Sequence, residues 1–260
     1  MPQSDSPQNA DVLGLKGFGD SMRIATQGVV DGAGAFLGRV CLPAAEELGL
    51  ALRDRVSSWR AKNACQILST ANDLYTANGM PPGAVNPRLI HQAIDQGSWI
   101  DDEVIQGMWA GLLCSAVTQD SSDENLLFVN LLAQLSGLQV RILLESVTNS
   151  QKYKIVHDLV GVRRLTLTID QIQEVAGSQD IQRIDRELDH LREIGLIGIR
   201  GSWNTGGGID AASGIVDITP TPLAIHLYVR AQGFTQSPAL FFNLELMPSP
   251  SPMVETPSDG

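Results

Sequence analysis

The apolar residues in the first part of the chain recur at the spacing of an α-helix. After Pro43 they follow one another in steps of three or four residues, or in multiples of these, which places them on one helix face. Proline suits the first turn of a helix, and Asn78 with Gly79, followed by two prolines, forms a strong stop. The pattern therefore predicts one helix of about nine turns, whose core face carries Leu48, Leu52, Val56, Trp59, Ile67, Ala71 and Leu74.

Capping sequences divide the stretch that follows into shorter helices. Asn86 precedes a proline, which predicts the start of a helix. Ser98 and Asp101 have the spacing of a capping box, with Asp in place of the usual Glu or Gln, and Ser136 and Gln139 form a second one. Helices with such short connections usually pack antiparallel, so we expect a helical bundle.

The pattern changes after residue 160. Thr168 or Asp170 would cap a short helix and Ser178 a longer one. A strand, a glycine-rich loop over residues 201–214, a second strand and another helix come next. This order is typical of a winged helix. The expected fold is thus mainly α, with an N-terminal helical bundle followed by a small winged-helix-like α+β module.

Composition suggests where these parts begin and end. We expect a disordered N-terminus over residues 1–21, the bundle over 22–158, the winged-helix-like module over 160–233 and a Pro-rich tail over 234–260. The tail contains an apolar island, which either docks on the body as a strand or turn or binds a partner. This island consists of Leu240, Phe241, Phe242, Leu244 and Leu246.

Charge argues against nucleic acid as a partner. The 260 residues include 29 acidic and 18 basic ones, for a formal net charge of −11, whereas phosphate binding relies on clustered Lys and Arg. The second helix of the winged-helix-like module, where DNA readout would occur, carries three arginines against five acidic residues. DNA binding through this module is therefore kept only as an alternative.

Three further features of the sequence favour a cytoplasmic protein. The three cysteines are far apart and lie in apolar helical patterns, which indicates buried thiols in a reducing compartment. The acidic start lacks the basic region and apolar core of a signal peptide. No run of about 18 uncharged apolar residues is long enough to cross a membrane.

The candidate catalytic residues are few. Asp101, Asp102 and Glu103 could hold a metal or act in acid–base chemistry, but acidic residues in a first helical turn are also what the helix dipole favours. The four histidines lie on separate predicted elements, and no Ser or Cys lies in a recognisable catalytic motif. We therefore predict no metal, cofactor or small-molecule ligand, and favour a binding protein, with an enzyme acting through these carboxylates left open.

The long helix carries a basic segment in this acidic chain. Its members are Arg53, Arg55, Arg60 and Lys62. They could bind an anionic partner, or they could form salt bridges to the protein's own acidic helices, for instance near Asp101–Glu103.

Large side chains and glycines suggest how the bundle packs. Trp59, Trp109 and Leu112 are expected in its core. Residues 24–42 carry glycines four residues apart among apolar side chains, a spacing that allows close helix contact. This segment is either a helix packed within the bundle or a segment that reaches a membrane on activation.

Two sequence blocks resemble the abortive infection alpha family of bacteria. The first block is Leu42-Pro-Ala-Ala-Glu-Glu-Leu-Gly49 with the later run Trp59-Arg-Ala-Lys-Asn63, and the second is the acidic step at 101–103 followed by Met108-Trp-Ala-Gly-Leu-Leu113. Weaker similarities extend the resemblance over residues 40–232. The chain departs from the family pattern at Gly111, where Asn is usual, and at Thr221–Pro222, where a Gly-containing step is usual.

The resemblance implies a role in phage defence by abortive infection, in which an infected cell stops growing or dies. It supplies no catalytic residues. The favoured function is a non-enzymatic sensor or effector that acts through a protein partner or self-association. The alternatives are a membrane-perturbing effector that uses residues 24–42 and a winged-helix DNA-binding regulator.

Overall fold

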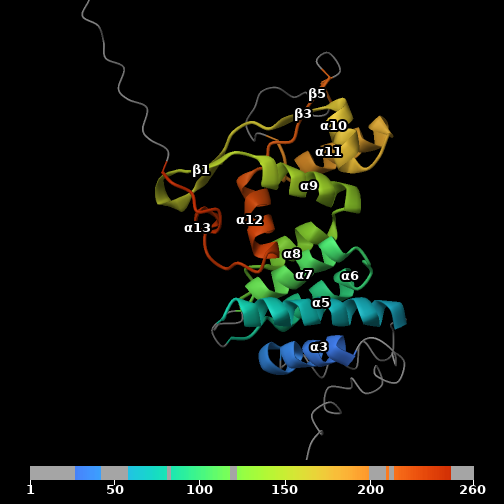
Figure 1. The fold of residues 1–260 in the computed structure, drawn as a ribbon, viewed down its shortest axis with the longest axis vertical. Helices are drawn as coiled ribbons and strands as arrows, with labels where there is room; N and C mark the ends of the chain where they lie inside the picture. Colours follow the sequence, from blue (N-terminus) through green and yellow to red (C-terminus); the bar gives the residue numbers. More distant parts are fainter. Residues whose placement is uncertain are drawn as a thin grey trace, which may run out of the picture.

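The computed structural model describes residues 27–41, 58–80, 83–117, 122–198, 209–210 and 214–246. The predicted mainly helical fold is confirmed (Figure 1). The first part of the described chain consists of α3 (Gln27–Val40), α5 (Ser58–Ala77), α6 (Pro87–Gly97), α7 (Glu103–Ser115), α8 (Leu126–Ala133) and α9 (Gly137–Asn149).

Two small antiparallel sheets follow the helices. The strands β1 (Lys152–Lys154) and β2 (Val160–Val162) form a hairpin around a 3-10 turn, η1 (Val156–Asp158). The second sheet has the order β3-β5-β4, from β3 (Thr166–Thr168), β4 (Ile209–Asp210) and β5 (Ile215–Asp217). The remaining helices are α10 (Ile169–Ala176), α11 (Ile181–Glu193), α12 (Pro222–Ala231) and α13 (Pro238–Phe241).

Several predicted helix starts are confirmed by their capping contacts. The Asn86 side chain accepts a hydrogen bond from the backbone of Arg88 at the start of α6. A capping box opens α9, where Ser136 and Gln139 bond each other's backbone, and Thr168 opens α10 in the same way with Gln171. These local contacts satisfy N–H groups that have no partner inside the helix.

Two other capping predictions are wrong. Ser98 does not start a helix but follows the last residue of α6, and its hydroxyl donates to the carbonyl oxygen of Asp95. Asp102 caps α7 instead, and Asp180 rather than Ser178 caps α11. In both cases the serine hydroxyl has a competing partner nearby, as when Ser178 accepts from the backbone N–H of Asp180.

One continuous core joins the helices to the sheets. It extends from Ala33 in α3 to Ala231 in α12, because α5 packs on α3 and α7, while α12 packs on α7 and α9. This core therefore includes residues on both sides of the domain boundary that the sequence predicts near residue 159. The domain boundaries themselves stay a prediction.

Glycine allows the closest of these helix contacts. A Cβ atom at Gly111 in α7 would lie 1.8 Å from the carbonyl oxygen of Ala231 in α12. The departure from the family's Asn therefore has a structural cause, since α12 occupies the space that any side chain at this position would need. Gly32 in α3 has a similar role, because its Cβ would lie 2.5 Å from the Ser69 hydroxyl in α5.

The expected core position of Trp59 needs correction. Trp109 and Leu112 are fully buried, whereas Trp59 is 40% exposed in the first turn of α5. The face of α5 that packs in the core carries Ala61, Ala64 and Leu68. Trp59 lies nine residues before Leu68, which is about half a turn away around the helix. The part of the predicted long helix over residues 43–57 lies outside the described residues.

The segment considered for membrane contact is packed against α5. In α3, Ala33, Phe36, Leu37 and Val40 are buried in the common core. In the ranges that the structure describes, no helix has both the length and the apolar character to cross a membrane.

The aromatic part of the C-terminal apolar island docks on the body. Phe242 stacks on Tyr228 of α12 with ring centroids 6.2 Å apart, and Phe241 contacts both rings edge-on. Lys152 lies over the Phe242 ring at 4.5 Å and donates to the carbonyl oxygens of Val147 and Ser150. This lysine thus fastens the C-terminal segment and the β1–β2 hairpin to the end of α9. Residues 1–26, 199–208 and 247–260, which include predicted terminal and loop segments, lie outside the described residues.

Candidate functional site

Two tryptophans are exposed side by side where the start of α5 meets the end of α6. The ring centroids of Trp59 and Trp99 lie 6.5 Å apart, with 55° between the ring planes. Trp59 is 40% exposed and Trp99 is 60% exposed. Large aromatic side chains are costly to leave in water, so an exposed pair of this kind points to contact with another molecule.

Arg60 holds Trp99 in place through a stacking contact and hydrogen bonds to neighbouring residues. Its guanidinium carbon lies 3.9 Å from the centroid of the Trp99 ring. Its Nε and Nη2 donate to the Ser98 hydroxyl at 3.0 and 2.8 Å, and Nη2 also donates to the backbone oxygen and the carboxylate of Asp95 at 3.0 Å. Asn63, also in α5, donates to the carbonyl oxygen of Ser98 at 3.1 Å. We call Trp59, Arg60 and Trp99 the tryptophan corner.

The basic segment predicted as a binding surface is therefore divided. The Arg60 side chain is only 12% exposed and forms an ion pair with Asp95, so it does not face solvent as a free cation. Its acidic partner lies in α6, not in the step at 101–103. Lys62 is exposed on α5, while Arg53 and Arg55 lie outside the described residues.

One carboxylate contacts the tryptophan corner, and three more follow it closely in the chain. Asp95 is half-exposed, and the residues Asp101–Glu103, which follow Trp99 closely, are all exposed. Asp102 caps α7 by accepting from the backbone N–H groups of Val104 and Ile105 at 2.9 and 3.1 Å. The acidic step thus helps to start the helix, and Val104 beside it adds a 57% exposed apolar side chain.

The groups that could support other chemistry are sparse in the described residues. They contain no group of three or more His, Cys, Asp or Glu side chains that could hold a metal. Burial raises the pKa of Cys41 to about 12 and that of Cys65 to about 11. Burial also raises the pKa of Cys114 to about 11, against the opposing effect of a hydrogen bond with Asn78. Thiols with such pKa values stay protonated at neutral pH and are poor nucleophiles.

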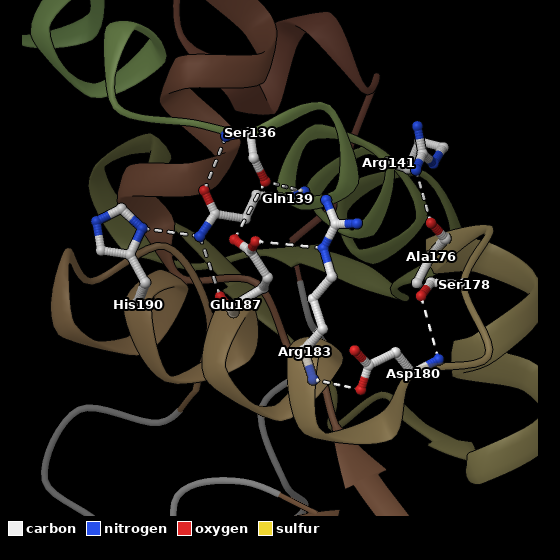
Figure 2. A network of polar contacts seen from close by, with 9 residues as sticks. All are labelled: Ser136, Gln139, Arg141, Ala176, Ser178, Asp180, Arg183, Glu187 and His190. Atoms are coloured by element: carbon white, nitrogen blue, oxygen red, sulfur yellow. Dashed lines mark hydrogen bonds and ion pairs between the residues drawn. The ribbon is translucent and has the colours of Figure 1, made fainter.

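A second polar cluster joins α9 to α11 (Figure 2). The Gln139 amide donates to the carbonyl oxygen of Glu187 at 3.2 Å and lies 2.8 Å from Nδ1 of His190. Ser136 donates its hydroxyl proton to the Glu187 carboxylate at 3.1 Å. The same residues that cap α9 therefore hold α11 against it. This cluster is an internal joint between two helices.

Two arginines of α11, Arg183 and Arg192, are also engaged within the protein. Arg192 donates to the Asp189 carboxylate and to the carbonyl oxygen of Asp217 in β5, both at 3.3 Å. Arg183 forms an ion pair with the Glu187 carboxylate at 3.9 Å, and Figure 2 shows the two side chains pointing toward each other. Two of the three basic residues that DNA binding through this helix would need thus have acidic partners, which argues against phosphate contacts.

Comparison with known proteins supports the family indicated by the sequence. A family model described as abortive infection alpha matches residues 63–216, more than half of the chain. The chain belongs to the abortive infection alpha family. Membership implies abortive-infection phage defence. No curated protein and no solved structure matches the chain significantly.

The matched range of this abortive infection alpha protein includes Asn63, Trp99 and the acidic step at 101–103, while Trp59 and Arg60 come just before it. Asn63, at the end of the first sequence block, bonds the carbonyl oxygen of Ser98, three residues before the acidic step of the second block. Sequence reasoning missed Trp99 and the Arg60–Asp95 pair. Trp99 lies outside the two sequence blocks, so the only indication in the sequence was its position two residues before the acidic step.

Proposed function

We propose that this protein acts in abortive infection by binding another protein through the tryptophan corner. The observation that carries the proposal is the exposed Trp59–Trp99 pair held in place by Arg60. Trp and Arg are the residues most enriched where binding energy concentrates in protein interfaces. Because four hydrogen bonds already fix the arginine, little side-chain entropy would be lost on binding.

The charges around the corner indicate what kind of partner would fit. The carboxylate of Asp95 pairs with Arg60 at the corner, and the exposed carboxylates of residues 101–103 follow Trp99 in the chain, with Lys62 as an opposing charge on α5. A partner segment with an apolar anchor flanked by Lys or Arg would place the anchor against the two tryptophan rings and its charges near these carboxylates. We therefore propose a partner with a basic surface. Action in the cytoplasm is part of the proposal.

We further propose that the region from β3 to α12 is a winged-helix-like scaffold with a structural or protein-binding role. The order of its elements and the antiparallel β3-β5-β4 sheet support this. The internal contacts of Arg183 and Arg192 favour this role over DNA binding.

A phage infection experiment tests the proposed function. Cells with and without the gene would be infected at low and high phage-to-cell ratios while culture density is followed. We expect protection at low ratio and early growth arrest at high ratio. A Trp59→Ala/Trp99→Ala variant should lose both effects while its melting curve shows that it is still folded at the growth temperature, because both side chains are substantially exposed.

The matched control is Leu127→Ala, which removes a 53% exposed apolar side chain from α8. It should protect as well as the unchanged protein. Full protection by the double tryptophan variant would refute the role of the corner, and absence of protection by the unchanged protein against a broad phage panel would refute the function.

A further inference from the structure

Exposed apolar side chains gather around the tip of the β1–β2 hairpin. Val156 and Leu159 are 62% and 60% exposed, and Ile155 beside them is 38% exposed. The C-terminal segment runs along β1, where the Lys154 N–H donates to the carbonyl oxygen of Glu245 at 3.3 Å and Leu246 forms a parallel bridge. This segment adds Leu240 and Leu246, so five of the ten large apolar side chains exposed in the described ranges belong to this region.

The tip is held in a defined and costly conformation. His157 and Asp158 both have left-handed backbone angles, with φ of 58° and 60°, which non-glycine residues rarely adopt. The Ile155 N–H donates to the carbonyl oxygen of Leu159 at 2.7 Å, and Lys154 pairs with Asp158 at 2.6 Å. These contacts keep the turn in a shape that leaves its apolar residues in water. Strained backbone of this kind is concentrated at functional sites.

The hairpin is also basic in an acidic chain. Residues 152–164 contain Lys152, Lys154, Arg163 and Arg164 against Asp158, which pairs with Lys154, and the C-terminal segment beside β1 adds the exposed Glu245, while the chain as a whole carries −11. Arg163 is exposed, Arg164 pairs with Asp217 at 2.8 Å, and Lys152 fastens the base of the hairpin to α9. The basic residues thus lie on the strands and just beyond β2, while the most exposed apolar ones lie at the turn.

From this arrangement we propose that the β1–β2 tip, residues 155–159, inserts into the headgroup region of an anionic lipid bilayer. The apolar side chains lie at the turn and the exposed Arg163 lies just beyond β2, which matches the order of a membrane interface, in which acyl chains lie beneath phosphates. The hairpin lies at the edge of the molecule, well away from α3 and α5 (Figure 1). A protruding turn offers a protein partner little area, but its side chains can enter lipid. Membrane contact would leave the tryptophan corner open to its partner.

Vesicle co-sedimentation of the full chain tests the proposal. The unchanged protein should pellet with vesicles of mixed phosphatidylcholine and phosphatidylglycerol, more weakly with phosphatidylcholine alone, and less as salt is added. Val156→Ser/Leu159→Ser should lower the partition coefficient about tenfold or more, because it removes several exposed methyl and methylene groups. The matched control Leu127→Ser removes a similarly exposed leucine from α8 and should leave the partition unchanged.

Three results would overturn the proposal. One is that the unchanged protein stays in the supernatant with both kinds of vesicle. Another is that Leu127→Ser weakens binding as much as the double variant. The third is that light scattering shows a dimer that Val156→Ser/Leu159→Ser converts to a monomer, since the tip would then contact a second copy of the chain. Melting curves establish that each variant is folded.

Discussion

The guanidinium of Arg60 stacks on the ring of Trp99, with its central carbon 3.9 Å from the ring centroid. This contact joins the first turn of α5 to the residue after the α6 cap, and the same guanidinium pairs with Asp95. An arginine that is buried on one side and stacked on the other fixes the position of an exposed tryptophan. It thereby connects the stability of the helix junction to the shape of the proposed binding surface.

Replacing Arg60 should test that connection. Arg60→Lys keeps the charge but loses the planar group that stacks on Trp99 while bonding Ser98 and Asp95. We expect a loss of about 2 kcal/mol in the free energy of unfolding, measured by urea denaturation, and a change in tryptophan fluorescence. Arg88→Lys alters an exposed arginine on α6 and should change stability by less than about 0.5 kcal/mol. Equal effects of the two variants would contradict the structural role of Arg60.

Gly111 and Gly107 offer a paired test within α7. Gly111→Ala would bring Cβ within 1.8 Å of the Ala231 oxygen, so α7 and α12 must separate, and we expect a loss of about 3 kcal/mol or more. Gly107→Ala meets no atom within 4 Å and should gain up to about 1 kcal/mol from helix propensity. Thermal unfolding measures the difference in stability between the two variants. Similar melting temperatures would show that α12 does not lie on Gly111.

Gln139 and Gln171 occupy the same position in two capping boxes but differ in their other contacts. Gln139→Ala keeps the Ser136 cap but removes the bond from the Ser136 N–H to the Gln139 side chain, together with the contacts to Glu187 and His190, and should cost about 2 kcal/mol. Gln171 is exposed at the start of α10, so Gln171→Ala should cost under about 1 kcal/mol. Urea denaturation of the two variants gives both values. If Gln171→Ala lowered the free energy of unfolding more than Gln139→Ala, the contacts between α9 and α11 would not stabilise the fold as described.

Asp217 makes the stability of the C-terminal sheet depend on pH. Burial alone would raise the pKa of this carboxyl, but hydrogen bonds from Thr219 and Arg164 outweigh burial and hold the pKa below its ordinary value. A lowered pKa in the folded state means that the stabilisation is present above the unfolded pKa of about 3.9 and is lost as pH falls through the folded value.

The corresponding test compares the unchanged protein with Asp217→Asn, which resembles the protonated carboxyl. Above about pH 5 the variant should be less stable by about 1 kcal/mol, and the difference should shrink as the pH falls below about 4. Denaturation over this pH range measures the difference. A gap that stays constant down to pH 3 would mean that Asp217 does not titrate in the expected direction.

Local interactions made much of the fold predictable from the sequence. The starts of α6, α9 and α10 depend on side chains within three residues of the backbone they cap, so their sequences suffice. Helical spacing likewise showed that Trp109 and Leu112 would be buried, because the face of α7 that carries them is apolar over several turns.

Two of the errors arose where a residue's partner is distant in the chain, whereas the Ser178 error has a local cause in its contact with Asp180. Ser98 has the spacing of an N-cap, but Arg60 of α5 donates to its hydroxyl. Trp59 continues an apolar pattern, but α3 and α7 pack against another face of α5. The family resemblance indicated that both sequence blocks mattered, without showing that they touch.

The sequence by itself thus determined the mainly helical fold, several helix starts and the family, because these follow from local backbone chemistry and from recurring patterns. Only the tertiary structure decided that Trp59 and Trp99 form one exposed surface, that Gly111 makes room for α12, and that apolar side chains meet at the β1–β2 tip. Each of these depends on which helix faces pack together, and that choice is made by the fit of side chains far apart in the chain.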